Sequence, residues 1–497
     1  MRCRLSKHRI TKRLCLLLPL IFISVFITAC NSSLHGLNKN KPVSLSFWHH
    51  YMGEQKAMLD NLVTEFNNTI GAEKGITVIA HKMDNTGDIH NKLVSAAKGE
   101  PGSDGFPDMA TAYPGTAYTL YNMGKLISLE KYMSKKELDK YEQSFLEEGR
   151  LTPESGIVIF PIAKSTEVIY INYTFYKQFL DDYNRKSPEN KLDENMLSTF
   201  EGISETAKAY YNWTDSKTPD KPDDGKAFYG FDAVSNFAIV GFKQLGADFF
   251  SVHDKSGEID LNNPAMDSIW KEYFVPAVKG YYGAYSFYRS EDVQTGDLIM
   301  FAGSSAGAGF FPNTVTFADN TKFDIELKVL PYPTFKNGRN IAVQQGAGVI
   351  VANTSPQKEY ASIVFLKWLT EPKRNIDFVL KTGYLPVTNE AIEKILPEEL
   401  SKIKDDTACI NVSKVINAAL DMMKTHDMYT YKPFDHSDDI RYAFEDKYLS
   451  YTAEAREEFI NDLSGGSDFS SCVKSKITKQ SFDQFLAEVR DEILKAR

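Results

Sequence analysis

The stretch Val43–Glu54, VSLSFWHHYMGE, is where the chain first has the pattern of a folded domain. Apolar and polar side chains alternate up to Phe47, which is typical of a β-strand with one buried face. The alternation ends in Trp48–Tyr51, WHHY, and apolar residues then recur at helical spacing. Four ring side chains where a strand ends fit a metal site, an active site or a wall that binds a ligand.

The residues before this stretch are typical of a bacterial export signal. Six basic and no acidic side chains lie in residues 1–29, and the apolar run over Leu14–Thr28 is short for a membrane-spanning helix. The run ends in Ile27–Cys30, ITAC, which resembles the lipobox of bacterial lipoproteins. We therefore expect residues 1–29 to be a signal peptide, Cys30 to carry the lipid (palmitate), and residues 30–42 to form a flexible tether. An uncleaved membrane anchor is the alternative, and in either case the remaining chain lies outside the cytoplasm.

Charge and cysteine content exclude several classes of protein. The 497-residue chain has a formal net charge of −9, and removal of the basic segment 1–29 leaves −15, which argues against binding to nucleic acid. Only Cys409 and Cys472 lie beyond the lipobox, and they could pair in an oxidising compartment. No spacing of Cys and His typical of a metal site occurs, so we expect no metal and no cofactor.

Strand and helix patterns alternate after the opening strand. Residues 59–66 have helical spacing, residues 76–80 alternate, residues 89–97 are helical again, and Pro107–Tyr113 has the pattern of a further strand. This order predicts βαβ units and a mostly parallel sheet.

The same pattern returns late in the chain. Ile341–Ala352 is predicted to be a buried strand, and the next helix is capped by Ser355 and begins at Pro356. The region between the two α/β blocks is rich in aromatic residues, and the chain after Glu390 is mainly amphipathic helix.

Five segments carry the resemblance of this chain to a known family. They are FWHHYMGE (Phe47–Glu54), PIAKSTEVIYINYTFY (Pro161–Tyr176), TGDLIMFAGSSAG (Thr295–Gly307), QGAGVIVANTSPQKEYASIVFLKWLT (Gln345–Thr370) and KTGYLPVT (Lys381–Thr388). In this order they resemble the matching segments of bacterial family 1 extracellular solute-binding lipoproteins. These are the receptors of ABC importers for carbohydrates, and the resemblance is strongest to the glycerol-3-phosphate-binding type.

The resemblance implies an α/β fold of two lobes, the type II periplasmic-binding-protein fold. Strands would cross between the lobes near residues 161–166, 333–340 and 371–375, and the C-terminal part would be helical. One lobe would then consist of residues 43–160 plus 341–371, and the other of residues 166–334 plus 375–497.

A ligand in such a fold lies beyond the carboxyl ends of the strands. Tyr and Trp rings can stack on the C–H faces of a sugar, while hydroxyl, amide and imidazole groups bind its hydroxyls. Trp48 could instead be a core residue, and only one of His49 and His50 can face the ligand because neighbouring strand residues point to opposite sides. About half of Tyr281, Tyr282, Tyr285 and Tyr288 should be core, and the rest could line the far wall. The ligand-binding residues that we expect are Trp48, His49, Tyr51, Tyr113, Ser165, Thr166, Asp232, Ser304, Ser305, Gly346 and Tyr384.

One departure from the glycerol-3-phosphate type bears on the ligand. In those receptors an Arg near the C-terminal end meets the phosphate, whereas the region Tyr431–Ser437 offers Lys432 and no clear Arg. A bidentate guanidinium is the usual means of holding a phosphate. The sequence therefore favours a neutral sugar or oligosaccharide.

The expected function is that of an extracytoplasmic, lipid-anchored and monomeric substrate-binding component of an ABC transporter. It would deliver its carbohydrate to the permease subunits in the membrane and catalyse no reaction. A receptor for glycerol-3-phosphate or a glycerophosphodiester is one alternative. The other is a secreted carbohydrate-active enzyme, which needs two carboxylates at a fixed separation across a cleft, and no pair in the sequence is an obvious candidate.

Overall fold

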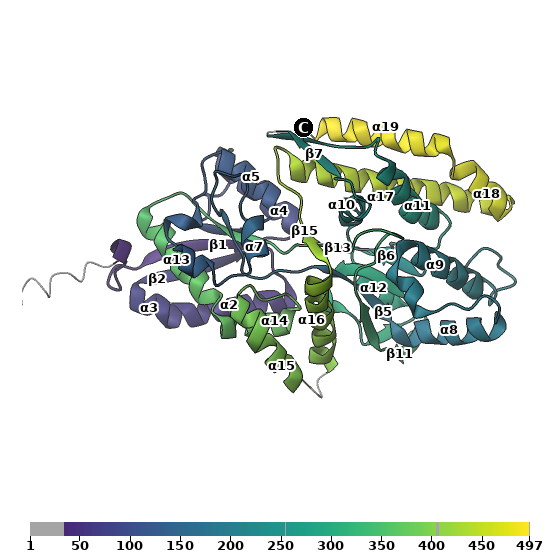
Figure 1. The fold of residues 1–497 in the computed structure, drawn as a ribbon, viewed down its shortest axis with the longest axis horizontal. Coiled ribbons are helices and arrows are strands. Elements are labelled where there is room, and N and C mark those ends of the chain that lie inside the picture. The colour runs from purple at the N-terminus through teal and green to yellow at the C-terminus, as the bar shows by residue number, and fades with distance from the viewer. Residues whose placement is uncertain (1–33, 254, 404–406, 497) are drawn as a thin grey trace, which may run out of the picture.

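The computed structural model describes residues 34–253, 255–403 and 407–496. The expected signal peptide and Cys30 lie outside this part of the chain. Two α/β lobes lie side by side along the longest axis, and the chain passes between them at the middle of the molecule (Figure 1). No helix in the described ranges has the length and apolar character needed to cross a membrane.

The first lobe is built on a five-stranded sheet with the order β2-β1-β3-β14-β4. Strand β1 (Val43–His49) runs parallel to its neighbours β2 (Ile76–Lys82) and β3 (Met109–Ala112), as the βαβ pattern predicted. Strand β14 (Gly348–Val351) inserts between β3 and β4 (Ile159–Phe160) and is antiparallel to both. The late block therefore completes the early sheet, and only part of that sheet is parallel.

Helices cover both faces of this sheet. On one face Phe66 and Phe365 pack edge to face at 5.0 Å, and Phe47 of β1 packs on Phe365. On the other face Trp48 joins a separate apolar cluster with Ile89 and Tyr118. The helices of this lobe are η1 (Leu34–Gly36), α2 (Gly53–Asn68), α3 (Ile70–Lys74), α4 (Thr86–Lys98), α5 (Pro114–Asn122), η2 (Leu129–Lys131), α6 (Lys135–Leu138), α7 (Gln143–Glu148) and α13 (Pro356–Leu369).

The second lobe is built on a four-stranded sheet with the order β12-β5-β9-β6. The fully buried β5 (Glu167–Asn172) is antiparallel to β12 (Leu327–Leu330) and β9 (Met300–Ser304), and β9 is parallel to β6 (Tyr229–Phe231). The other elements are α8 (Tyr173–Lys186), η3 (Glu194–Ser198), α9 (Phe200–Asp215), α10 (Val234–Gln244), β7 (Phe250–His253), β8 (Ser256–Ile259), α11 (Pro264–Val278), α12 (Arg289–Thr295), η4 (Ser305–Phe310), β10 (Thr314–Thr316), β11 (Lys322–Asp324) and α16 (Thr407–Thr425).

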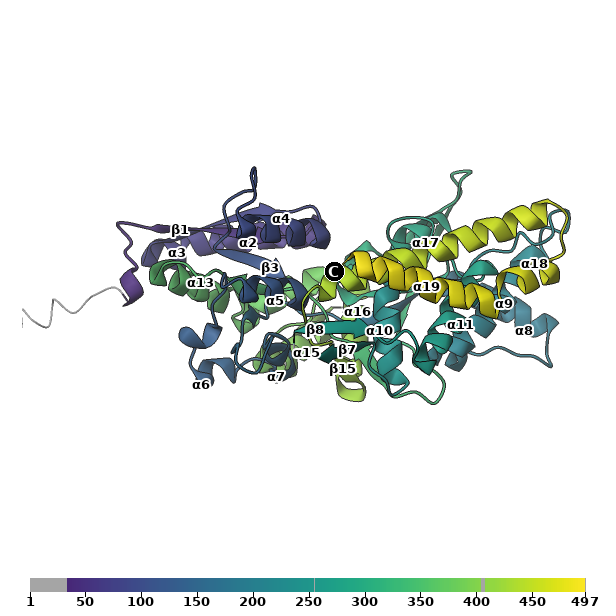
Figure 2. The same ribbon diagram turned by 90° about the horizontal axis from the view of Figure 1, so that it is seen from above.

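The C-terminal part is helical, as expected. Helix α17 (Ser437–Ser464) lies beside α19 (Lys479–Lys495), with the short α18 (Phe469–Lys476) between them in the chain (Figure 2). Trp270 of α11 packs its ring on Phe485 of α19 at 5.0 Å, which fixes these helices on the second lobe. Cys472 of α18 is a free thiol, so no disulfide joins it to Cys409.

The segments that cross between the lobes pair with one another. Ser165 forms an antiparallel bridge with Gln345, and Lys164 forms one with Leu385. Strand β13 (Ile341–Val343) runs parallel to β15 (Asp427–Tyr429). The prediction of one strand over Ile341–Ala352 is wrong, because Gly346 at φ 96° breaks it into β13 and β14, which lie in different sheets.

Residues 375–389, which we expect to belong to the second lobe, have contacts with both lobes. In α14 (Pro372–Thr382), Phe378 packs on Tyr51 at 5.7 Å, and Thr388 bridges Tyr141 of the first lobe. Helix α14 also contacts α16 and η4 of the second lobe, so it lies between the two lobes. It is followed by the π-helical η5 (Ala391–Ile395) and by α15 (Leu396–Lys402).

Candidate functional site

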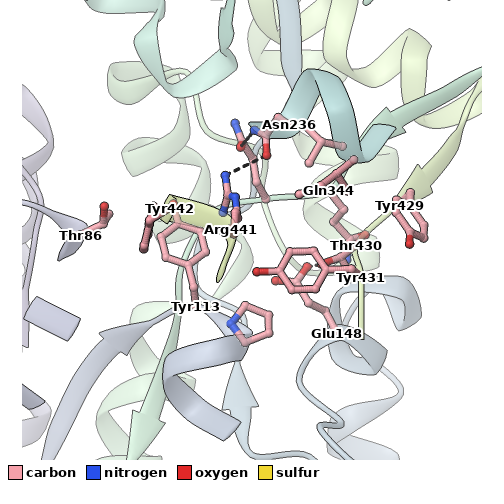
Figure 3. Close-up of a pocket in the computed structure, with 14 residues that line it drawn as sticks. Thr86, Tyr113, Glu148, Asn236, Gln344, Tyr429, Thr430, Tyr431, Arg441 and Tyr442 are labelled. Atoms are coloured by element: carbon pink, nitrogen blue, oxygen red, sulfur yellow. Dashed lines mark hydrogen bonds between the residues drawn. The ribbon is translucent and has the colours of Figure 1, made fainter. Parts of the chain in front are cut away.

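A cavity of about 140 Å³ lies between the lobes, next to the crossing segments (Figure 3). Both lobes and the crossing segments contribute to its wall, so a ligand that fills it contacts all three parts. The lining residues are Thr86, Tyr113, Pro114 and Glu148 of the first lobe, Asn236, Ile239, Arg441 and Tyr442 of the second, and Val343, Gln344, Gln345, Tyr429, Thr430 and Tyr431 of the crossing segments.

Arg441 of α17 is the cation of this cavity. Its Nε donates to Ser235 Oγ at 3.1 Å, and its Nη2 donates to Asn236 Oδ1 at 2.9 Å. Asn236 Nδ2 donates in turn to Glu167 Oε1 at 2.6 Å and to Gln345 Oε1 at 3.1 Å. Among the described residues no carboxylate forms an ion pair with Arg441, which leaves guanidinium N–H groups for a ligand.

Glu148 is the acid of the cavity, and its charge is already paired. Its Oε1 accepts from Lys164 Nζ at 2.6 Å and its Oε2 from Gln344 Nε2 at 2.6 Å. Lys164 Nζ also donates to Gly346 O at 2.7 Å. Only 2% of the Lys164 side chain and 5% of the Glu148 side chain are exposed. The pair ties α7 to two crossing segments, and the carboxylates whose charges act on Arg441 are instead Asp438 and Glu445 of its own helix.

Tyrosine rings supply the apolar faces of the cavity. Tyr113, Tyr431 and Tyr442 surround the space in front of Arg441 (Figure 3). Burial holds the pKa of Tyr113 and the pKa of Tyr431 above the ordinary value, so both hydroxyls are neutral at physiological pH. Tyr431 Oη donates to Asp438 Oδ1 at 3.0 Å. Flat rings with neutral hydroxyls at their edges suit a ligand with both C–H and O–H surface.

Tyr113, at the start of α5, is the one expected residue among those that line the cavity. Ser165, Thr166 and Gly346 lie in the crossing segments beside it and are buried. At Gly346 a Cβ atom would lie 2.9 Å from Ala163 O. The close approach that this glycine permits is therefore to another crossing segment of the same chain.

The rings of the opening motif lie in the packed interior. Tyr51 meets Tyr384 edge to face at 5.9 Å, and His49 stacks on Tyr51 at 5.8 Å. Trp48 points to the opposite side of the sheet, as alternation along a strand requires. Burial lowers the pKa of His49 and of His50 to about 4, so both imidazoles are neutral. Trp48, His49, Tyr51 and Tyr384 are not among the residues that line the cavity.

Asp232, Ser304 and Ser305 lie at the ends of β6 and β9 and bond within the protein. Ser304 Oγ accepts from Ala306 N and caps η4, while Ser305 is buried against Thr166. Asp232 accepts from Arg289 N at 2.9 Å, and burial raises the pKa of Asp232 to about 6. Of the tyrosines proposed for the far wall, Tyr281 and Tyr282 are buried whereas Tyr285 and Tyr288 are exposed.

Most of the cavity wall was missed from the sequence. The region Tyr431–Ser437 suggested Lys432, whereas the structure brings in Arg441 from the first turns of α17. Arg441 lies beyond the segments that carry the family resemblance, which end at Thr388. No group of His, Cys, Asp and Glu within the described ranges could hold a metal ion.

Comparison with known proteins gives both a family and a fold. A family model described as bacterial extracellular solute-binding protein matches residues 61–409. No curated protein matches the chain significantly by sequence. Among solved structures, the cyclic alpha-maltosyl-1,6-maltose binding protein from Arthrobacter globiformis is similar, with a TM-score of 0.60 and 16% sequence identity. That alignment covers 90% of this chain and 99% of the other.

Two further structures are similar to this one. UgpB from Mycobacterium tuberculosis, in complex with glycerophosphocholine, has a TM-score of 0.62 at 15% identity and covers 91% of this chain and 98% of its own. An ABC substrate-binding protein from Listeria monocytogenes, in complex with cycloalternan, has a TM-score of 0.62 at 15% identity and covers 90% of this chain and 98% of its own. These likenesses confirm the expected two-lobe fold.

Proposed function

Because the chain belongs to the bacterial extracellular solute-binding proteins, we propose that it is the substrate-binding component of an ABC importer. It captures a sugar or oligosaccharide between its lobes and delivers it to the permease subunits in the membrane. The observation that carries this proposal is the cavity between the lobes, whose wall is shared by both lobes and the crossing segments. A ligand bound there favours closure, because only the closed form brings every contact to it.

The side chains of the cavity fit a small polar ligand with apolar faces. Tyr113, Tyr431 and Tyr442 offer rings, and Asn236, Gln344 and Gln345 offer amides. We place the expected residues Ser165, Thr166 and Gly346 behind this wall, where they support the crossing segments. For Trp48, His49, Tyr51, Asp232, Ser304, Ser305 and Tyr384 a ligand contact stays a prediction.

A second candidate ligand is favoured by Arg441. A guanidinium without a carboxylate partner suits an anionic group, and planar N–H donors match a phosphate well. This observation supports the alternative of glycerol-3-phosphate or a glycerophosphodiester, which the sequence had disfavoured for want of an Arg.

The proposal includes the cellular setting expected from the sequence. The signal peptide 1–29 is removed, Cys30 carries the lipid, and the monomeric receptor stands on the extracytoplasmic face of the membrane. Its lobes are residues 43–160 plus 341–371 and residues 166–334 plus 375–497, and α14 contacts both of them. It has no catalytic role.

Thermal unfolding of the mature chain with a ligand panel tests the proposal. The panel contains maltose, maltotriose, cycloalternan, glycerol-3-phosphate and glycerophosphocholine. A ligand at 100 times its Kd should stabilise the folded state by about 2.7 kcal/mol. A stabilising sugar would establish the first candidate, and a stabilising phosphate compound the second. Chromatography of the incubated panel should find every compound intact. No stabilisation by any compound, or release of a cleaved product, would contradict the proposed receptor.

A further inference from the structure

Helix α5 of the first lobe begins without a side-chain cap of its own. Its N-cap residue is Tyr113, which makes no capping hydrogen bond, and Pro114 follows at the first helical position. The first N–H groups of a helix need acceptors, and the helix dipole favours a negative charge beside them. In this protein the carboxylate that lies there comes from the other lobe.

That carboxylate belongs to Asp438, in the first turn of α17. Asp438 Oδ2 accepts from Thr116 Oγ1 of α5 at 3.1 Å, in a buried hydrogen bond that joins the two lobes. On the first-lobe side, His90 Nδ1 of α4 lies 2.8 Å from Thr116 Oγ1, and His90 Nε2 lies 3.8 Å from Asp439 Oδ1. Two consecutive acidic residues of α17 therefore meet the helix starts of the first lobe.

Gly115 is the residue that admits Asp438. A Cβ atom built on Gly115 would lie 2.3 Å from Asp438 Oδ1 and 2.6 Å from Oδ2, far inside contact distance. Gly115 itself sits within α5, where alanine would be the better helix former. The glycine is therefore unfavourable for the first lobe alone, and it has a purpose only when the second lobe closes on it.

The same carboxylate reaches the cavity. Asp438 Oδ1 accepts from Tyr431 Oη at 3.0 Å, and Tyr431 lines the cavity next to Arg441. Asp438 also precedes Arg441 by three residues on α17, on the same side of the helix. The contact between the lobes and the orientation of a cavity side chain thus share one group.

We propose that Asp438 is a positioning residue which latches the closed form by accepting a hydrogen bond from Thr116 at the start of α5 of the opposite lobe and which, in that position, fixes Tyr431 against the ligand. Because the carboxylate meets α5 only when the lobes are together, closure and the arrangement of the cavity wall are coupled. The role of this coupling in the capture of a ligand rests on the proposed function. The latch itself needs no ligand: it stabilises the closed form of the ligand-free protein, and a bound ligand stabilises that form further.

Small-angle X-ray scattering of the ligand-free mature chain tests the latch. Wild type should be compact, and Gly115→Ala should shift to a larger radius of gyration because its methyl group excludes the carboxylate. Gly87→Ala is the matched control, since Gly87 also lies in the first turn of a helix of this lobe and a Cβ there meets only Asn85 Oδ1, at 3.4 Å. It should leave the scattering of wild type unchanged. Thermal unfolding of each variant reports whether its fold is intact.

Two further substitutions keep the test decisive if Gly115→Ala fails to fold. Thr116→Val and Asp438→Asn each weaken the same hydrogen bond without added bulk, and each should expand the protein at an unchanged melting temperature. Equal radii of gyration for wild type and the latch variants, whether all compact or all extended, would overturn the inference. No ligand enters this measurement, so its outcome is independent of whether the panel finds one.

Discussion

Two ring-rich regions of the molecule lie close together and differ in what their polar atoms do. Around the end of β1, Tyr51 and Tyr384 pack with His49 in an apolar interior, and neither imidazole nitrogen of His49 nor Tyr51 Oη has a hydrogen-bond partner among the described residues. Around the cavity, Arg441 and Glu148 are held by directional bonds to neighbouring side chains. The comparison teaches that rings alone do not distinguish the cavity from the packed interior beside it, because Tyr residues occur in both, whereas hydrogen-bonded charged groups line only the cavity.

The largest expected effect tests the polar support of the cavity. Lys164→Met leaves the buried Glu148 without its cation, which should reduce the free energy of unfolding by about 3–5 kcal/mol. Urea denaturation measures this change. Lys135→Met, which removes an exposed ion pair with Asp139, is the control and should have little effect. A Lys164→Met variant as stable as this control would contradict a structural role for the pair.

The next effect concerns ligand affinity. Arg441→Met removes a charged donor from the cavity, and hydrogen bonds to charged groups contribute about 1.5–3 kcal/mol. We expect the Kd of the ligand selected by the melting panel to rise by roughly 10- to 100-fold. Isothermal titration calorimetry measures it. Tyr384→Phe, in the packed rings around the end of β1, is the comparison. If it weakened binding more than Arg441→Met did, the ligand would bind at those rings and not in the cavity.

The third expected effect is a pH dependence of the free energy of unfolding, caused by Glu167 behind the cavity wall. Burial raises the pKa of Glu167 to about 8, so the folded state binds this proton more tightly than the unfolded state. This contribution to the free energy of unfolding is fully present below the ordinary carboxyl pKa. It is lost as the pH rises from there to about 8, where Glu167 ionises in the folded state. Between pH 6 and pH 8 wild type should lose about 2 kcal/mol relative to Glu167→Gln, in urea titrations at each pH. Parallel pH profiles for the two proteins would show that Glu167 is ionised throughout.

The smallest effect probes the packed cluster. Tyr51 Oη is buried without a hydrogen-bond partner among the described residues, so Tyr51→Phe removes an unsatisfied polar group. We expect it to raise the free energy of unfolding by about 1 kcal/mol. Tyr431→Phe, which removes the bond to Asp438, should not raise it. A loss of stability in Tyr51→Phe would mean that the hydroxyl is satisfied after all.

The sequence predicted the elements that depend on local pattern. Alternation predicted β1, and the Ser-Pro pair predicted the start of α13, where Ser355 Oγ accepts from Lys358 N at 3.3 Å. The return of the late block to the first sheet also followed from pattern and resemblance.

The cavity wall depends on how distant helices pack against one another, which no local sequence pattern predicts. Arg441 and Arg456 both lie on α17, yet Arg456 Nη1 binds Val278 O while Arg441 reaches the cavity. Only the placement of α17 against the first lobe distinguishes them. The sequence could not separate the rings of Trp48–Tyr51 from those of the cavity for the same reason, because a strand end beside a cavity and a strand end in the packed interior have the same composition.

The insertion of β14 between β3 and β4 has a consequence for biosynthesis. Residues 43–160 cannot finish their sheet until residues 348–351 have been made, so the contacts that stabilise the first lobe have a large sequence separation. High contact order slows folding. We therefore expect the first lobe of the nascent chain to stay unfolded until β14 has been synthesised, and to gain its stability together with the second lobe.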